Sequence, residues 1–358
     1  MMKQFLAIAV MALSSFCSLS AQTATSTYTP GATTEGIVYF LPKTAIRVAV
    51  QIEKTTYTPG DFAQYAERFL RLKDVSSEPS TVHRIISLSQ TAVGERDTTK
   101  AFVIKFNNKT SAVNVSRTDD GLLLAVNAQP LEQNVPTPFK AHAKRQPLDP
   151  RQFMSEEILA AGSKAKMAQL TAQEIYDIRD SRSQLIKGQA DFMPKDAEQM
   201  KMMLSQLEQQ DQALTSLFTG TVVRDTVEEI FMVHPSAELA KVPLFRFSRH
   251  FGVVDIDDMS GAPYFITVQN LTELPATDEK KAAKRKKEED GLYYNVPGKM
   301  RTTVFRGNEP LNTEDLPSAQ FGNVELLSGE LFNKHYGTRL WMNAITGGID
   351  RLEAEQSK

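Results

Sequence analysis

The sequence predicts an α+β protein in which two β-rich lobes bracket an antiparallel helical pair. Short runs of β-branched and aromatic residues with alternating polarity fill the chain before residue 130 and after residue 220. Between them, residues 155–220 are rich in Glu, Gln, Lys, Ala and Met, with apolar residues at helical spacing. The stretch GIVYFLP at 36–42 also returns as GLYYNVP at 291–297, with Gly, Tyr and Pro at the same spacing.

The repeated stretch suggests that the two lobes are related by an internal repeat, and a chance match is the alternative. We expect the proline of each copy to end an edge strand and the glycine to permit a tight turn. The repeat therefore concerns the scaffold. The expected organisation is a signal peptide (1–21), an N-terminal α+β lobe (22–130), a linker (131–150), the helical pair (151–220) and a C-terminal β-rich lobe (221–358) with a charged loop at 278–290.

The N-terminus has the layout of a secretory signal peptide. Lys3 precedes an apolar run that is too short to span a membrane, and small residues lead to Ala21. We expect export, with cleavage after Ala21. A lipoprotein modified at Cys17 is the alternative, but the large Phe16 precedes that cysteine.

Cysteine content and charge exclude several classes of function. Cys17 is the only cysteine in the sequence and lies in the leader, so the mature chain has no disulfide, thiolate nucleophile or cysteine-ligated metal. The formal net charge of −2 points away from a nucleic-acid partner. We also expect no cofactor, since the sequence contains no Walker loop and no dinucleotide fingerprint.

The first lobe is expected to place strands around one helix. In TAIRVAVQI (44–52), apolar and polar residues alternate, so one face of this strand should be buried. DFAQYAERFLRL (61–72) predicts a helix with Asp61 as its N-cap. Further strands are expected at VHRIISLSQ (82–90), KAFVIKF (100–106), SAVNVSR (111–117) and LLLAVN (122–127).

Two helices are expected after the proline-rich linker. Thr171 and Glu174 fit a capping box at a helix start, and Gly188 fits the end of that helix. The second helix should open after Pro194 and close at Gly220. Its apolar stripe consists of Met200, Met203, Leu204, Leu207, Leu214, Leu217 and Phe218.

Strand signals return in the second lobe and continue to the C-terminus. They are interrupted by the charge run at 278–290, which we interpret as an insertion. The expected strand regions are 221–235, 243–257, 263–271, 291–305, 319–327, 338–346 and 347–355.

Several of these stretches together resemble a family of exported Bacteroidota proteins, the domain-of-unknown-function family 4831. The resemblance covers nearly the whole mature chain. It implies an exported envelope protein of a Gram-negative bacterium, in the periplasm or associated with the outer membrane, and it implies no reaction or site. The matching stretches include YFLPKTAIRVAVQIEKTTYTPGDFAQYAERFLRLKDV (39–75), TDDGLLLAVN (118–127), LFRFSRHFGVVDIDDMSGAPYF (244–265), AQFGNVELL (319–327) and TGGID (346–350).

Candidate chemical groups are sparse. The five histidines are not spaced for a shared helix face, and no Gly-x-Ser-x-Gly occurs. The stretch DIDDMSG offers Asp255, Asp257 and Asp258 as candidate calcium ligands, although it lacks the spacing of an EF-hand loop. A solvated acidic turn is the alternative.

Two further stretches are candidates for contact with partners. Met200, Met203 and Leu207 form a stripe that is either core between the helices or an adaptable surface for a protein partner. The charge run is either a solvated loop or a peripheral membrane contact with anionic lipid headgroups. Its basic residues are Lys280, Lys281, Lys284, Arg285, Lys286 and Lys287.

Three functions are therefore weighed. The first is a non-enzymatic exported envelope protein that acts as a binding or structural component, associated with an outer-membrane assembly. The second is a hydrolase acting on glycans or peptides through paired carboxylates, drawn from Asp119 and Asp120 or from residues 255–258. The third is a carbohydrate-binding module, for which the single tryptophan, Trp341, offers little aromatic platform.

Overall fold

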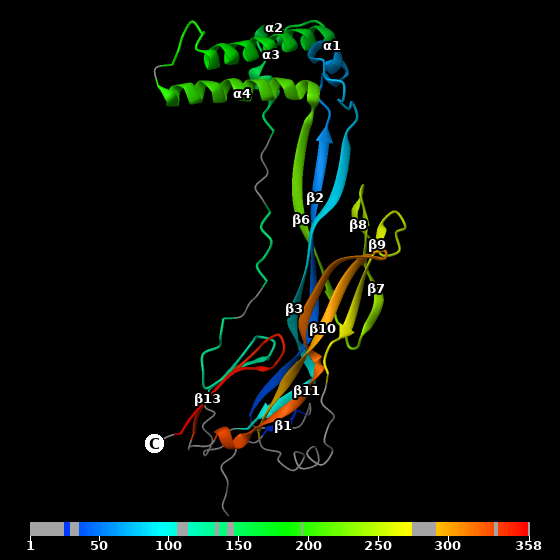
Figure 1. Cartoon of the computed structure of the whole chain (residues 1–358), viewed down its shortest axis with the longest axis vertical. Helices are drawn as coiled ribbons and strands as arrows, with labels where there is room; N and C mark the ends of the chain where they lie inside the picture. Colours follow the sequence, from blue (N-terminus) through cyan, green and yellow to red (C-terminus); the bar gives the residue numbers. More distant parts are fainter. Residues whose placement is uncertain are drawn as a thin grey trace, which may run out of the picture.

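The computed structural model shows an elongated molecule with three parts. A stem of long strands carries the helices at one end, called the head, and a small sheet lies at the opposite end, called the base (Figure 1). The protein is β-rich, as predicted, and its three sheets are antiparallel. The residues that the structure describes are 25–28, 36–105, 114–132, 136–141, 147–194, 196–273, 291–332 and 336–356.

The stem sheet is built on two very long strands, β2 (Ile37–Thr58) and β3 (Ser80–Ile104). One face of β2 is buried, as the alternation of its residues predicts. The buried residues are Ile46, Val48, Val50 and Ile52. They pack against the middle sheet. In spatial order the strands are β1 (Thr25–Thr27), β3 (Ser80–Ile104), β2 (Ile37–Thr58) and β6 (Thr221–Val233).

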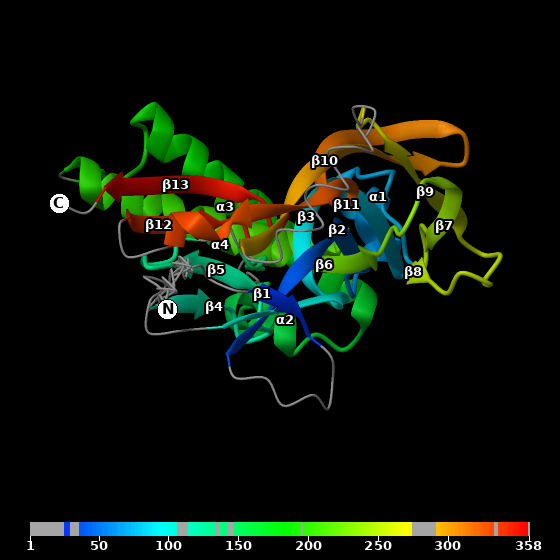
Figure 2. The ribbon, with the colours of Figure 1, turned by 90° about the horizontal axis from the view of Figure 1, so that it is seen from below.

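The other two sheets lie beside the stem and at its base. Figure 2 shows them on different sides of the stem strands when the molecule is seen from below. The middle sheet has the order β11 (Glu309–Ser328), β10 (Gly291–Arg306), β9 (Ala262–Asn270), β7 (Leu239–Ser248) and β8 (Gly252–Val254). The base sheet has the order β13 (Ile349–Gln356), β12 (Tyr336–Met342), β5 (Leu123–Val126) and β4 (Val115–Arg117).

The expected division of the strands into two lobes is wrong. The stem sheet joins β1, β2 and β3, which precede the helices, to β6, which follows them. The base sheet likewise pairs β5 with β12. A change in composition marks the helical segment, but backbone pairing joins strands from both sides of that segment into the same sheets.

The two similar stretches, 36–42 and 291–297, meet at the base. The Tyr39 hydroxyl accepts a hydrogen bond from the Tyr293 N–H at 2.9 Å and donates to the Tyr293 carbonyl oxygen at 3.2 Å. The Asn295 amide donates to the Pro42 carbonyl oxygen at 3.1 Å. Their contact makes the two stretches a single structural unit, while their common origin stays a prediction.

The roles expected for the proline and glycine of each copy are also wrong. Pro42 and Pro297 do not end strands, because β2 and β10 continue well beyond them and shift register beside each proline. A bulge accommodates a residue without an N–H inside a strand. Gly36 and Gly291 do not form tight turns: a Cβ on either would overlap the backbone of the neighbouring strand.

Two long helices project from the top of the stem and form what we call the arm (Figure 1). They are α3 (Lys164–Lys187) and α4 (Ala197–Thr219). Helix α3 begins about two turns before the expected capping box, with Ser163 as N-cap. The Thr171 hydroxyl instead donates to the Met167 carbonyl oxygen inside the helix. The expected ends at Gly188 and Gly220 are confirmed.

Smaller helices cover only the part of the arm nearest the stem. The helix predicted at 61–72 is short, and Asp61 makes no capping bond because the first turn begins after Phe62. It belongs to the head rather than to a β lobe, since Phe62 packs on α3 and α4. The small helices of the head are η1 (Ala63–Tyr65), α1 (Ala66–Leu70), η2 (Pro150–Phe153) and α2 (Glu156–Leu159). Another short helix, η3 (Gly329–Phe332), lies at the base.

Candidate functional site

A groove runs between α3 and α4 at the end of the arm that lies away from the stem. Its volume is about 370 Å³. We call it the arm groove. It is lined by Ser181, Gln184 and Leu185 of α3, by Ala190 and Phe192 of the connection, and by Met203, Gln206, Leu207 and Gln210 of α4.

The arm groove continues an apolar stripe that is buried closer to the stem. On α4, Met203, Leu207 and Gln210 are followed at helical spacing by Leu214 and Leu217, which are buried. The buried part of the stripe is covered by η1, α1 and η2, which contribute Phe62, Ala66, Leu70 and Phe153 to the same cluster. In the described part of the chain, no such element covers the groove. The stripe is therefore open where the arm leaves the head.

Large apolar side chains in and next to the groove lining are exposed. Phe192 of the lining is 63% exposed, and Ile186 and Met202, which follow Leu185 and precede Met203 in sequence, are 64% and 67% exposed. Exposed large apolar side chains at an open apolar stripe are typical of surfaces that bind a partner.

Charges lie across the two helices beside the groove rather than in its lining. The Arg179 guanidinium contacts Asp211 at 3.0 Å, and Arg182 pairs with Glu208. The lining itself offers apolar side chains with serine and glutamine, which are uncharged. The groove can therefore bury an apolar segment without desolvating a charge.

The structure brings two of the three predicted partner-binding residues together. Met203 and Leu207 line the groove, whereas Met200 is half-buried one turn earlier and is not part of the lining. Sequence reasoning missed Leu185 and Phe192. An apolar pair, Phe192 and Met193, just before Pro194 was the available signal, because a connection between helices is ordinarily polar.

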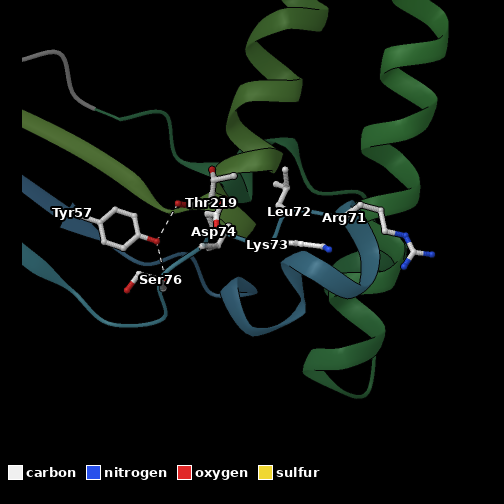
Figure 3. Close-up of a pocket in the computed structure, with 8 residues that line it drawn as sticks. Tyr57, Arg71, Leu72, Lys73, Asp74, Ser76 and Thr219 are labelled. Atoms are coloured by element: carbon white, nitrogen blue, oxygen red, sulfur yellow. Dashed lines mark hydrogen bonds between the residues drawn. The ribbon is translucent and has the colours of Figure 1, made fainter.

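A second hollow lies where the head meets the stem (Figure 3). It has a volume of about 680 Å³ and is lined by residues 71–76 with Tyr57 and Thr219. The Tyr57 hydroxyl lies 2.7 Å from the Ser76 carbonyl oxygen and 3.2 Å from that of Thr219, while Arg71 points away from it. The Tyr57 hydroxyl of the stem thus contacts the backbone of residues at or next to the helices, and it joins the head to the stem.

The acidic candidates lie on the exposed loop between β8 and β9. The Asp258 carboxylate accepts hydrogen bonds from Ser260, which lower the pKa of Asp258. Its N–H donates to the Asp255 carbonyl oxygen, and Asp255, Asp257 and Asp258 are all exposed. Among the described residues, no group of three or more His, Cys, Asp or Glu side chains is arranged to hold a metal ion. The loop therefore has the contacts of a self-capped turn.

The other carboxylates proposed for a hydrolase lie on a different sheet. Asp119 and Asp120 are exposed at the turn between β4 and β5, in the base sheet. The loop with Asp258 belongs to the middle sheet. The two stretches therefore lie in different sheets, and the carboxylates of each are exposed at a turn.

Trp341, the aromatic residue considered for carbohydrate binding, is engaged within the base. Its indole N–H donates to the Gln129 carbonyl oxygen at 2.9 Å. The Arg351 guanidinium lies over its ring, 5.0 Å from the centroid. The ring is therefore not an open platform on that face.

Several predictions fall outside the described residues. They are the signal peptide with Cys17 and the basic run from Lys280 to Lys287. Of the described helices, none combines the length and the apolar character needed to cross a membrane.

The fold and the groove define a β-rich protein that presents a helical arm on a long stem. The chain belongs to a family described as a domain of unknown function, DUF4831, whose model matches residues 35–350. The resemblance of the sequence to the domain-of-unknown-function family 4831 is thereby confirmed. Comparisons with curated proteins and with solved structures found no match.

Proposed function

We propose that the protein is an exported, non-enzymatic binding component of the cell envelope, associated with an outer-membrane assembly. Its arm groove binds the apolar face of a helix from a partner protein. The observation that carries this proposal is the continuous stripe on α3 and α4, which is covered near the stem and open in the groove.

The covered half of the arm supports a helix as the occupant. There, α1 packs on α3 through Ala66 and Leu70, so the two long helices already accept a third helix along this stripe. Helix packing of this kind buries apolar surface, and each Å² removed from water stabilises the complex by about 25 cal/mol. Glutamine side chains on the groove wall can hydrogen-bond polar groups at the edge of the incoming helix.

The methionine content of the groove fits a protein partner. Met203 lines the groove and Met202 is exposed beside it. Methionine side chains are unbranched and polarizable, so they adapt to the shape of a bound helix. In this proposal the stripe on α4 serves two purposes. Leu207 packs against the core of the head, and Met203 and Leu207 also line the surface that contacts the partner.

Crosslinking in intact cells tests the groove. A photoreactive residue replaces Ser181, and the tagged full-length protein is purified from the envelope fraction after irradiation. We expect one reproducible crosslinked protein, attached through a segment that is helical in that protein. The crosslink should be lost in the double variant Ile186→Glu, Met202→Glu. Both side chains are largely exposed, so the variant should fold.

The matched control is Leu159→Glu, which changes an exposed apolar residue of the head outside the groove. It should leave the crosslink unchanged. Recovery of the uncrosslinked chain alone, or equal loss in the control, would contradict the proposal.

Export is tested separately. The mature protein from the envelope fraction should begin at Gln22 and carry no lipid, which intact-mass measurement reads directly. A chain that retains the first 21 residues in the cytoplasm would contradict the envelope location.

A further inference from the structure

The edges of the three sheets are protected in different ways. A strand at an edge exposes unpaired backbone groups, and proteins ordinarily shorten, charge or kink such strands to prevent pairing with another chain. Three edge strands, β1, β4 and β8, have only three residues each. Edge strand β13 carries four charged residues among eight, and β11 contains Pro310 and Pro317 and shifts register against its neighbour.

Strand β6 is neither short nor kinked, although it carries charged residues. It is 13 residues long and contains no proline, glycine or lysine. It pairs with β2 from Ile46 to Thr58 without a register shift, and no described strand pairs with its other side. Exposed apolar side chains follow its length: Val222, Val227, Ile230 and Met232 are 40–55% exposed.

We propose that β6 is a docking edge for an extended segment of a partner protein, which adds to the stem sheet as a further strand. Backbone N–H and C=O groups of β6 supply the bonds, and side chains that alternate along the strand supply the preference for one sequence. This edge is separate from the arm groove and does not depend on it.

The charges of β6 select the kind of segment. Arg224 and Glu229 are exposed, whereas Glu228 is paired with Arg47 at 2.8 Å. Opposite charges on facing strands stabilise a pair, and like charges destabilise it. The segment therefore carries an acidic residue opposite Arg224, a basic residue opposite Glu229, and apolar residues opposite Val222 and Ile230.

The same charges disfavour a second copy of this chain. If two β6 strands paired antiparallel over their whole length, Thr221 would face Val233 of the other copy. Asp225 would then face Glu229 twice, placing like charges opposite each other. A partner segment of different sequence avoids this repulsion.

Hydrogen exchange at residue resolution tests the edge on the full mature chain. In the free protein, alternate amides of β6 should exchange rapidly, because only the others bond to β2. The probe is a synthetic peptide matched to the 13 residues of β6, with alternating Val and Thr, Glu opposite Arg224 and Lys opposite Glu229. Saturating peptide should protect the rapidly exchanging set, and the same peptide N-methylated at alternate residues should not.

Edge variants complete the test. Val222→Lys with Ile230→Lys should weaken peptide binding by about tenfold or more, because lysines on an edge oppose strand addition. The control is Leu311→Lys with Val324→Lys on β11, two positions of similar exposure, which should bind as the unaltered protein does.

Three results would overturn the proposal. The first is that the β11 control variant weakens peptide binding as much as the β6 variant does. The second is that alternate β6 amides exchange rapidly in the free protein but saturating peptide does not protect them. Slow exchange of every β6 amide in a protein with the mass of a dimer would assign the edge to a second copy instead.

Discussion

The base of the stem and the outer half of the arm solve the problem of burial differently. At the base, segments distant in sequence converge, and Tyr39, Leu340 and Asn295 are fully buried there. In the outer arm, two helices that are consecutive in sequence face each other. After Ile178, the buried residue of α3 is Leu185. The described core of the base is therefore enclosed by several distant segments, while the outer arm keeps an open apolar side.

The contrast assigns different tasks to the two regions. Close packing gives the core of the base rigidity, because its buried side chains leave little free space. Open packing gives the arm a surface that a partner can complete. Stability and binding should therefore respond to mutations in different regions, and four predictions test this separation in order of expected effect.

The largest effect is expected at Gly94, where the stem meets the base. A Cβ at this position would overlap the Ala344 carbonyl oxygen, so Gly94→Ala forces backbone to move. We expect a loss of about 4 kcal/mol or more in the free energy of unfolding, measured by chemical denaturation. The control is Gly162→Ala in the head, where a Cβ meets no atom within 4 Å. A control as destabilised as the variant would contradict the contrast.

The second prediction compares two positions on α4. Leu214 is fully buried under the small helices, so Leu214→Ala should cost about 2–5 kcal/mol. Met203 lines the open groove, so water fills the space left by Met203→Ala and the cost should be smaller. Chemical denaturation of both variants gives the difference. Equal costs would mean that the groove is packed as tightly as the covered half.

The same two regions show what the sequence could predict. Local patterns predicted the C-terminal ends of both arm helices and the buried face of β2, because a glycine cap and an alternation of polarity depend on neighbouring residues. The pairing of β6 with β2 was missed, because no local signal states which distant strand is adjacent. The prolines at 42 and 297 were misread for the same reason: a bulge depends on the partner strand.

The candidate site was predictable only in part. The spacing of Met203 and Leu207 marks an apolar stripe but is the same for core and for an open groove. A core stripe differs from an open groove in whether α1 and η2 cover it. The length and position of these short helices follow from tertiary packing, which the local sequence does not show. The acidic loop could be located from sequence, but its self-capping bond from Ser260 to Asp258 could not.

The third prediction concerns pH and the base. Burial raises the pKa of the Tyr39 hydroxyl, which accepts from and donates to Tyr293. Because the folded pKa lies above the unfolded value of about 10, its contribution is complete below pH 10 and is lost as pH rises further. Tyr39→Phe should cost about 1–3 kcal/mol at pH 8, since the Tyr293 N–H loses its acceptor.

The pH series supplies the control for this variant. The difference in unfolding free energy between the unaltered protein and Tyr39→Phe should narrow above pH 10, because only tyrosine must stay protonated in the fold. A difference that is constant from pH 8 to pH 11 would show that the hydroxyl does not titrate with unfolding.

The smallest effect is expected for the ion pairs that cross the arm. Arg179→Gln removes the contact to Asp211, and Arg182→Gln removes that to Glu208. Because both arginines are 43% exposed, each change should cost only about 0.2–1 kcal/mol at low salt and less in 1 M NaCl. The loss should appear as faster hydrogen exchange in the outer turns of α3 and α4, since few buried side chains hold them together. An equal acceleration in strands of the base would instead mean that the arm and the base unfold as one cooperative unit, and the division between a closed base and an open arm would not hold in solution.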